Sequence, residues 1–370
     1  MDIPYVRGRV AMQAHVGLPD GTYEEEYGRN GFFGRYAHLY RTHAPVGWTS
    51  IEGPCKPRSF DLRPAFGTGG DLFAQRRPML GNADVRCSTV GLSEPMPYLA
   101  RNADADELFF VHAGAGRLET DFGPLPYETG DYLYVPRGTC FRFAPSSLTT
   151  LLSIESRGEI SFPDRGMLGQ HAIFDPAVLR VPSPDEACTL GPDERGEWEL
   201  QILREDRITR VRYPFCPMDV VGWKGTLSPF VLNVRDIRPV VSDRYHLPPS
   251  AHTTFLLRNA VVCTFAPRPM ENGDPTALKV PYYHSNIDFD EVLFYHRGEF
   301  FSRAGIEPGM LTFHPQGIHH GPHPKAYERS KSATRTEEVA VMLDTKNPLS
   351  VLPAAEPLEN PNYFLSWSDR

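Results

Sequence analysis

The amino-acid sequence predicts an all-β fold with two related β domains. Residues 97–114 and 281–298 align without a gap at an offset of 184 positions and share Pro, Tyr, Asn, Asp, Glu, Phe, His and Gly. The 36 prolines and 31 glycines are spread along the chain, and the segments between them are short and rich in β-branched and aromatic residues. Such punctuation is typical of many short strands joined by tight turns. A chain of 370 residues is long enough for two such domains.

The repeat places an N-terminal β domain at residues 1–238 and a C-terminal domain at residues 239–370. The proline-bounded stretch Pro239–Pro249 (PVVSDRYHLPP) is the expected junction. Amphipathic helical stretches are few, and residues 23–29 (YEEEYGR) are a minor helical candidate.

The composition argues against several kinds of partner. The net charge is −8, and Lys and Arg form no long basic run, so neither nucleic acid nor an anionic membrane is expected as a partner. No segment approaches 18 consecutive apolar residues, and the N-terminus lacks the apolar stretch of a signal peptide. The six cysteines are scattered without a CxxC motif, which favours reduced thiols and a cytoplasmic location.

A second motif follows each copy of the repeat. Segments that begin at Gly130 and Gly309 both fit Gly-x5-Pro-x-Gly-x2-z, where z is Phe141 in the first copy and His320 in the second. With His at z, this motif resembles the second motif of the cupin barrel, a double-sheet jelly roll. The Pro-x-Gly turn there reverses the chain so that the next strand presents the histidine into the barrel. The expected fold is therefore bicupin-like, with a metal-free N-terminal unit and a metal-binding C-terminal barrel.

The repeat also separates scaffold residues from candidate ligands. His284 aligns with Ala100, whereas Glu291 aligns with Glu107, so His/Glu/His is complete only in the second copy. His284 and Glu291 are seven positions apart, an odd spacing that requires a bend or bulge before both can point inward. Two imidazoles and one carboxylate form the facial triad of non-haem Fe(II) oxygenases. We expect an Fe(II) site at His284, Glu291 and His320, of which Glu291 is the least secure ligand.

Eight of the thirteen histidines lie between residues 246 and 323. His296 aligns with His112 of the metal-free copy, which indicates a structural role. His319 precedes the ligand at 320 and should point the other way along a strand. His314 and His323 flank the ligand and could orient the site through hydrogen bonds.

The run PYYHSNIDFDEVLFYHRGEF, together with HPQGIHHGPHP and RTEEVAVMLDT behind it, resembles the homogentisate 1,2-dioxygenase family. The resemblance implies that His284, Glu291 and His320 are the iron ligands. It also implies that His246, in HLPPS, is the catalytic histidine and that Tyr282 lies near the substrate. We further expect Arg303 to bind the substrate carboxylate and His314 to contact the substrate.

The resemblance implies that homogentisate and O2 are converted to maleylacetoacetate, a step of tyrosine degradation and aromatic catabolism, or that a close 2,5-dihydroxyphenyl analogue is cleaved. It also implies a homo-oligomer, with trimers paired into hexamers. The chain departs from the family at Phe300, where some members have a tyrosine that contacts the substrate, and at Arg303, where they have a lysine. It is also shorter than typical members.

Two other classes of function remain open at this point. One is a cupin isomerase of small oxygenated metabolites, which would not consume oxygen. The other is a non-catalytic bicupin that serves as a binding protein. The histidine at position 246, beside a complete triad, argues against the second. The sequence suggests no role for His252.

Overall fold

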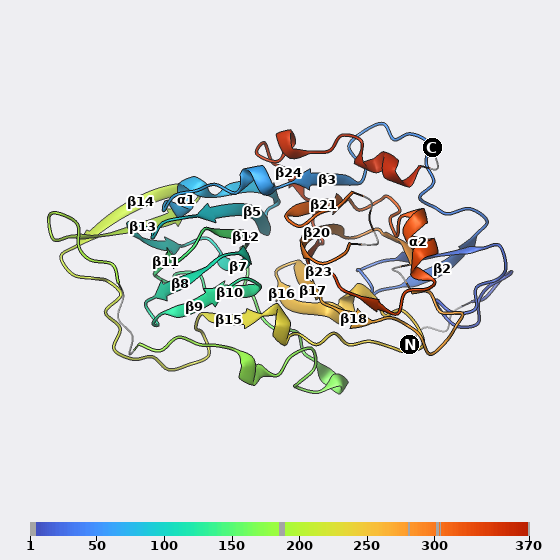
Figure 1. The fold of residues 1–370 in the computed structure, drawn as a ribbon, viewed down its shortest axis with the longest axis horizontal. Coiled ribbons are helices and arrows are strands. Elements are labelled where there is room, and N and C mark those ends of the chain that lie inside the picture. Colours follow the sequence, from blue (N-terminus) through green and yellow to red (C-terminus); the bar gives the residue numbers. More distant parts are fainter. Residues whose placement is uncertain (1–4, 185–188, 280–281, 301–302, 304, 369–370) are drawn as a thin grey trace.

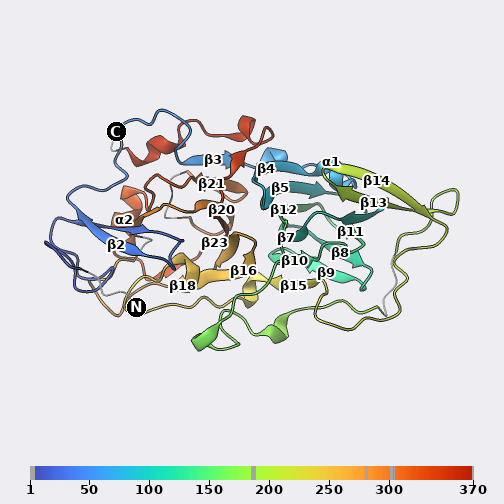
Figure 2. The ribbon, with the colours of Figure 1, turned by 180° about the vertical axis from the view of Figure 1, so that it is seen from behind.

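The computed structural model describes residues 5–184, 189–279, 282–300, 303 and 305–368. Two β lobes lie side by side along the long axis of the molecule (Figure 1). The same two lobes are seen from behind, with the C-terminal helical turns above the lobe that contains β20 and β23 (Figure 2). Strands dominate and the described helices are short, so the expected all-β, bicupin-like fold is confirmed.

The N-terminal lobe consists of two sheets. One has seven strands in the order β15-β10-β7-β12-β5-β4-β24, and the other has six in the order β14-β13-β6-β11-β8-β9. Their strands are β4 (Arg77–Gly81), β5 (Val85–Leu92), β6 (Leu99–Asn102), β7 (Asp106–Ala113), β8 (Ala115–Thr120), β9 (Leu125–Glu128), β10 (Asp131–Val135), β11 (Phe141–Pro145), β12 (Thr149–Ser156), β13 (Trp198–Arg204), β14 (Arg207–Tyr213), β15 (Phe230–Asn233) and β24 (Ser350–Val351).

The C-terminal lobe has a six-stranded sheet in the order β16-β17-β23-β20-β21-β3 and a three-stranded sheet in the order β19-β1-β2. Their strands are β1 (Tyr23–Gly28), β2 (Tyr36–Arg41), β3 (Arg58–Asp61), β16 (Thr253–Leu257), β17 (Ala260–Phe265), β19 (Tyr283–Asn286), β20 (Asp290–Arg297), β21 (Met310–His314) and β23 (Val339–Thr345). The remaining strands and the α-helices are β18 (Arg268–Pro269), β22 (Arg335–Thr336), α1 (Leu72–Gln75) and α2 (Pro324–Ser330).

Strand pairing links segments that are far apart in the sequence. The early strand β1 pairs in parallel with β19, and β3 pairs with β21. In the other direction, the late strand β24 pairs with β4. The boundary between residues 238 and 239 stays a prediction, and these three pairings cross it.

The residues that the two repeats share build the same turns in both lobes. Gly114 and Gly298 have φ angles of 100° and 99°, and Gly138 and Gly317 have φ angles of 88° and 89°. These left-handed conformations are costly for residues with a Cβ atom, which explains glycine at both places in each copy.

A shared aspartate ties each of these turns to its barrel. The Oδ1 atom of Asp106 accepts a hydrogen bond from the backbone N of Arg137 at 2.8 Å. In the second copy, Asp290 Oδ1 accepts from the backbone N of Gln316 at the same distance. The residues kept in both copies therefore include those that hold the scaffold together.

The two lobes meet through equivalent residues of the repeat. His112 Nδ1 lies 3.0 Å from His296 Nδ1, and these two residues are 184 positions apart. Phe110 and Phe294, also one repeat apart, have ring centroids 6.3 Å from each other in an edge-to-face arrangement. Equivalent side chains can touch in this way only where a pseudo-twofold axis passes between the lobes. His296 thus has the structural contact that its match to His112 predicts.

The helix expected at residues 23–29 is wrong, because Tyr23–Gly28 forms strand β1. Three consecutive glutamates favour a helix in isolation. Here the segment hydrogen-bonds to β2 on one side and to β19 on the other, so tertiary pairing overrides the local preference.

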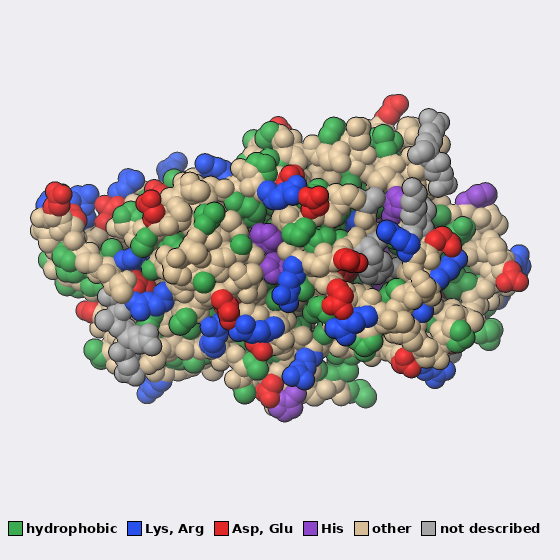
Figure 3. All heavy atoms as spheres, in the orientation of Figure 1, with side chains coloured by type: hydrophobic (Ala, Val, Ile, Leu, Met, Phe, Trp, Pro, Cys, Tyr) green, Lys and Arg blue, Asp and Glu red, His purple; other side chains and the backbone are tan. Residues whose placement is uncertain are grey.

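On the face of the molecule in Figure 3, Lys and Arg side chains are interspersed with Asp and Glu side chains. None of the helices in the described part of the chain is long and apolar enough to cross a membrane.

Candidate metal centre and adjoining pocket

The three candidate ligands come from two sheets and one turn of the C-terminal lobe. His284 lies on β19 and Glu291 on β20, whereas His320 follows the turn after β21. His284 and His320 face each other as a β-bridge, with N-to-O distances of 2.9 and 3.0 Å between their backbones. The turn between His284 and Glu291 supplies the bend that their odd spacing requires.

The three side chains converge at a spacing that suits one metal ion. One ligand atom from each of the three residues lies within 4.8 Å of the others. Glu291 Oε2 lies 3.5 Å from His320 Nε2 and 4.0 Å from His284 Nε2. Ligands at right angles about an ion with bonds of about 2.1 Å are about 3 Å apart, so a small contraction completes the site.

The protonation of the two imidazoles favours metal binding. His284 Nδ1 lies 3.0 Å from the carbonyl oxygen of Tyr282, which can only accept, so Nδ1 carries the proton and the lone pair of Nε2 is available to a metal. Burial and the neighbouring His320 lower the pKa of His284 to about 4, so it is neutral at pH 7. Both ring nitrogens of His320 are buried without a hydrogen-bond partner among the described residues, so Nε2 is available to a metal. These residues fit a divalent transition metal.

His314 lies behind the carboxylate ligand. Its Nδ1 donates a hydrogen bond to Glu291 Oε1 at 2.7 Å, and the side chain is fully buried. A donor at this position orients a carboxylate ligand. A signal for this role was present in the repeat, because His314 occupies the place that Val135 has in the metal-free copy.

Asp344 is a buried acid that the sequence reasoning missed. It lies directly across from Glu291 in the β20–β23 ladder. Burial, followed by the negative charge of Glu291, raises the pKa of Asp344 well above its usual value. Both effects favour the neutral form of the Asp344 side chain beside Glu291.

A pocket opens beside the candidate ligands. Its lining includes His284 and Glu291 together with His246, Arg268, Lys279 and Glu338. Burial raises the pKa of Glu338 to about 7, although Arg303 and Arg268 act in the opposite direction. Arg303 also lines this pocket. Together with Arg268 and Lys279, it places three cationic side chains next to the candidate metal ligands.

His246 is held in the pocket wall by a carboxylate. Its Nδ1 lies 3.1 Å from Glu271 Oε1, and Arg268 Nη1 donates to the same oxygen at 3.1 Å. Burial lowers the pKa of His246, against the opposing effect of Glu271. A neutral imidazole with Nδ1 paired to a carboxylate leaves Nε2 as a hydrogen-bond acceptor.

Arg303 lies between the pocket and the metal ligands. Its Nη1 donates to the carbonyl oxygen of Gly321 at 2.8 Å, and its Nη2 lies 3.9 Å from Glu291 Oε1. Phe300, the departure from the family's tyrosine, packs against Tyr295 with ring centroids 4.8 Å apart.

The other expected residues lie around this centre. Tyr282 and His314 are both described by the structure, and neither lines the pocket. The Tyr282 ring instead stacks on the His15 ring, with centroids 3.9 Å apart. His252 does line the pocket, and burial lowers its pKa to about 3. His319 points away, as expected, with Nε2 3.0 Å from Glu25 Oε1.

Comparison with known sequences identifies relatives of this chain. The family model described as "Homogentisate 1,2-dioxygenase N-terminal" matches residues 91–234. A protein of Saccharolobus solfataricus that is provisionally named a dioxygenase is 34% identical over 387 residues, with 98% of each chain covered.

Two homogentisate 1,2-dioxygenases are more distant relatives. The one from Bradyrhizobium diazoefficiens is 26% identical over 265 residues, 68% of this chain and 58% of the relative. The one from Rhizobium rhizogenes is 25% identical over 287 residues, 72% of this chain and 62% of the relative. The match therefore spans less than two thirds of either enzyme. Among solved structures, a cupin 2 conserved barrel protein from Leptotrichia buccalis aligns with a TM-score of 0.35 and 9% identity, over 78% of this chain and 96% of that chain.

Proposed function

Because the chain belongs to the homogentisate dioxygenase family, we propose that it is an Fe(II)-dependent dioxygenase that opens the ring of homogentisate or of a close 2,5-dihydroxyphenyl acid. The observation that carries the proposal is that a His/Glu/His donor set opens onto a pocket lined by three cationic side chains. When bound by His284, Glu291 and His320, Fe(II) would supply the redox chemistry that lets O2 react with a phenol. The product of homogentisate would be maleylacetoacetate.

His246 is the proposed catalytic histidine. With Nδ1 paired to Glu271, its Nε2 can accept the proton of a ring hydroxyl. The lowered pKa of His246 keeps the imidazole neutral, and therefore able to accept, at neutral pH. Glu338, with a pKa of about 7, is a second group in the pocket that can hold or release a proton near neutral pH.

Arg303 is the proposed partner of the substrate carboxylate. A guanidinium matches a carboxylate in a two-pronged geometry, and hydrogen bonds to charged groups are stronger than neutral ones. Arg268, which the sequence reasoning did not single out, lines the same pocket and is a second cation for an acidic substrate. Tyr282 and His314, expected to contact the substrate, are proposed to act from behind the ligands.

Oxygen uptake by iron-loaded protein tests the proposal. We expect consumption of one O2 per homogentisate, with formation of a ring-opened product, and slower turnover of the amide that lacks the negative charge. The same protein loaded with Zn²⁺ is the control and should be inactive. Absence of oxygen uptake with every 2,5-dihydroxyphenyl acid in a panel would overturn the proposal.

We also propose the homo-oligomer, trimer or hexamer, that the family resemblance implies. Large apolar side chains that would be covered in an assembly include Phe33, Met167 and Val221, which are 75%, 105% and 98% exposed in the single chain. Burial of apolar surface in a symmetric interface is the usual way to cover such groups. A monomer in sedimentation equilibrium at micromolar concentration would contradict this assembly.

A further inference from the structure

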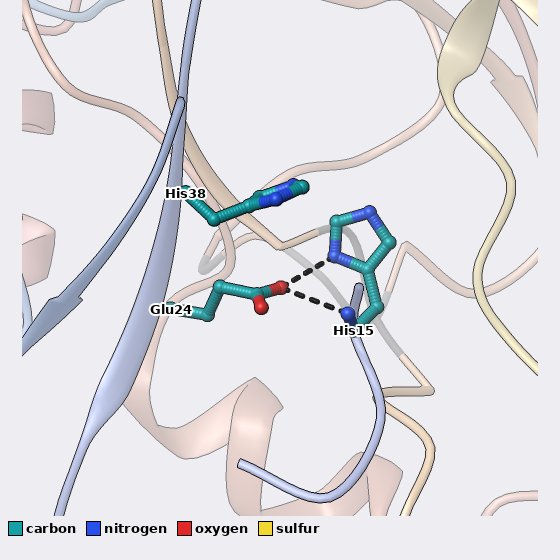
Figure 4. A group of neighbouring side chains, drawn as sticks. All are labelled: His15, Glu24 and His38. Atoms are coloured by element: carbon teal, nitrogen blue, oxygen red, sulfur yellow. Dashed lines mark hydrogen bonds and ion pairs between the residues drawn. The ribbon is translucent and has the colours of Figure 1, made fainter. Parts of the chain in front are cut away.

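A second cluster of histidine and glutamate side chains lies on the sheet β19-β1-β2. In the β1–β2 ladder, Glu26 lies opposite His38, and Glu24 lies opposite Tyr40. Because side chains two positions apart share one face of a strand, these four project to the same side. His15 reaches the cluster from the loop before β1, and its ring faces Glu24 and His38 (Figure 4).

One ligand-type atom from each of His15, Glu24 and His38 lies within 4.8 Å of the others, and Glu26 adjoins this group. Glu26 Oε2 lies 3.4 Å from His38 Nε2 and 3.8 Å from His15 Nε2. Two ligands of one tetrahedral zinc ion, with bonds of about 2.0–2.1 Å, are about 3.4 Å apart. His38 Nε2 is buried and has no hydrogen-bond partner in the part of the chain that the structure describes. The 3.4 Å contact is long for a hydrogen bond and matches the separation of two ligands of one ion.

Glu24 fixes the orientation of His15. Its Oε1 lies 2.6 Å from His15 Nδ1 and accepts from the backbone N of His15 at 3.0 Å, and its Oε2 accepts from the Tyr40 hydroxyl at 2.7 Å. A carboxylate only accepts, so Nδ1 carries the proton and Nε2 presents its lone pair. A carboxylate behind a histidine ligand is a recurrent arrangement in zinc sites, where it raises the basicity of the ligand.

The backbone at His15 is held in an unfavourable conformation. Its φ angle is 64°, in the left-handed region that costs energy for residues with a Cβ atom. The side chain is 5% exposed and stacks on Tyr282 with an interplanar angle of 7°. Surrounding contacts thus force the imidazole into the cluster, which is the pattern of a residue kept for binding rather than for local stability.

The charges of the cluster also favour binding of a cation. Among the described residues, neither Glu24 nor Glu26 has a Lys or Arg side chain within ion-pair distance; their partners are His15 and His38. Two carboxylates beside two imidazoles form an electrostatic setting that a divalent cation neutralises.

We propose that His15, His38 and Glu26 bind a second divalent transition-metal ion, zinc by its donor chemistry, with Glu24 as the positioning residue behind His15. The ion would tie the loop that contains His15 to β2. It would lie beside the iron centre, because Glu26 is the register partner of His284 in the β1–β19 ladder. Residues of the N-terminal segment would then brace the strand that carries an iron ligand.

The experiment counts zinc ions in variants that lack the iron site. His320→Phe protein, loaded with Zn²⁺ and passed through a desalting column, should retain a single ion per chain. His320→Phe/His38→Gln protein should retain none, and His320→Phe/His43→Gln, which changes an exposed histidine of the same segment, should retain one. Loss of zinc binding in His320→Phe alone, or retention in the His38→Gln double variant, would overturn the proposal.

Co²⁺ absorption supplies a readout that does not depend on the stability of the double variant. Titration of His320→Phe protein with Co²⁺ should produce visible d–d bands of a low-symmetry site with nitrogen ligands, and Zn²⁺ should displace them. Absence of these bands in folded His320→Phe protein would also overturn the proposal. This outcome is independent of the proposed dioxygenase activity, because the iron site is removed in every variant of the series.

Discussion

The two lobes bury an acidic pair at the same strand positions but compensate it differently. In the C-terminal lobe Glu291 lies across from Asp344, and in the N-terminal lobe Glu107 lies across from Glu155. The N-terminal pair holds the Arg76 guanidinium, with Nη2 2.5 Å from Glu107 and Nη1 3.0 Å from Glu155. In the C-terminal lobe the carboxylate of Glu291 faces two histidines, whereas in the N-terminal lobe the Arg76 side chain neutralises the pair.

The positions of the two candidate histidine ligands also differ between the lobes. Phe141 pairs with Ala100 in the N-terminal lobe, as His320 pairs with His284 in the C-terminal lobe. The Phe141 ring is fully buried and packs against Phe109, with ring centroids 6.2 Å apart. An aromatic core therefore fills the space where the other barrel keeps its ligands.

This comparison shows that the barrel fold does not require a metal, whereas the buried glutamate requires a positive partner. Leaving a buried charge unpaired costs several kcal/mol in proteins. The C-terminal lobe has histidines in place of two apolar residues, and its cation Arg303 lies 3.9 Å from Glu291, farther than Arg76 lies from Glu107.

The largest expected effect is that of His320→Phe, which copies the N-terminal lobe into the C-terminal one. Iron content should fall to the background level and oxygen uptake should disappear, because one of two imidazole ligands is gone. The melting temperature of the metal-free protein should change little, since the N-terminal barrel tolerates phenylalanine at this position. Iron analysis together with thermal unfolding of the metal-free proteins checks both parts.

Phe141→Leu is the matched control for this variant. It removes an aromatic ring from the equivalent position in the other lobe, so it should lower stability without affecting iron. Iron retained at the wild-type level in His320→Phe would show that the comparison between the lobes does not identify the ligands.

Arg76→Met should produce the next largest effect, on stability instead of activity. Removing one partner of a buried ion pair typically costs about 3–5 kcal/mol, because the remaining charges are left uncompensated. The free energy of unfolding from urea titration measures the loss. In Arg76→Met/Glu107→Leu, much of the lost free energy of unfolding should be recovered. The iron content per folded chain should be unchanged in both variants.

The pH dependence of Arg76→Met gives a further check. Burial raises the pKa of Glu107 even with Arg76 in place. A carboxyl group with a raised pKa in the folded state favours folding at low pH and loses this contribution as the pH rises above its ordinary value of 4.5. The deficit of the variant should therefore grow from pH 4.5 toward neutrality. A deficit that is constant with pH would mean that charge is not its cause.

The fold and the convergence of His284, Glu291 and His320 could be predicted from the sequence because the repeat acts as an internal control. Residues common to both copies, such as Asp106 and Asp290, hold turns; the histidines at 284 and 320 appear in one copy only. These signals are local, since the ligands lie within a short stretch of chain whose strand pattern is repeated.

The rest depends on contacts between distant segments. Arg76 precedes the first repeat, and nothing in its neighbourhood shows that it reaches Glu107 on β7. The same holds for Glu26, which pairs with β19 across more than two thirds of the chain. Local preference even favoured a helix there. Which strand lies beside which is decided by tertiary packing, and that information is not contained in short motifs.

Arg303→Met tests the pocket beside Glu291 in the C-terminal lobe. If Arg303 binds the substrate carboxylate, KM for the acid should rise about ten- to a hundredfold, as expected for a lost hydrogen bond to a charged group worth about 1.5–3 kcal/mol. KM for the neutral amide should stay nearly unchanged. Because Arg303 lies near Glu291, iron content must be measured for each preparation. Equal losses on both compounds would exclude a carboxylate role, and Arg268→Met is then the variant to compare.

The smallest expected effect concerns the axis where the lobes meet. Burial lowers the pKa of His112 to about 4, and burial together with the charge of His112 lowers that of His296 to about 3. A histidine with a lowered folded-state pKa stabilises the fold above its ordinary value of 6.5, and this contribution is lost as the pH falls toward the folded-state value. Acidification from pH 7 to pH 5 should therefore cost about 1 kcal/mol per histidine, with allowance for the partial exposure of His112. Urea titration at the two pH values measures the loss of unfolding free energy on acidification. This loss should be smaller in His112→Gln/His296→Gln than in the wild type. In His171→Gln, whose side chain is exposed, it should equal that of the wild type. If the double variant loses as much unfolding free energy on acidification as the wild type, the contact between His112 and His296 is not the cause of the acid sensitivity.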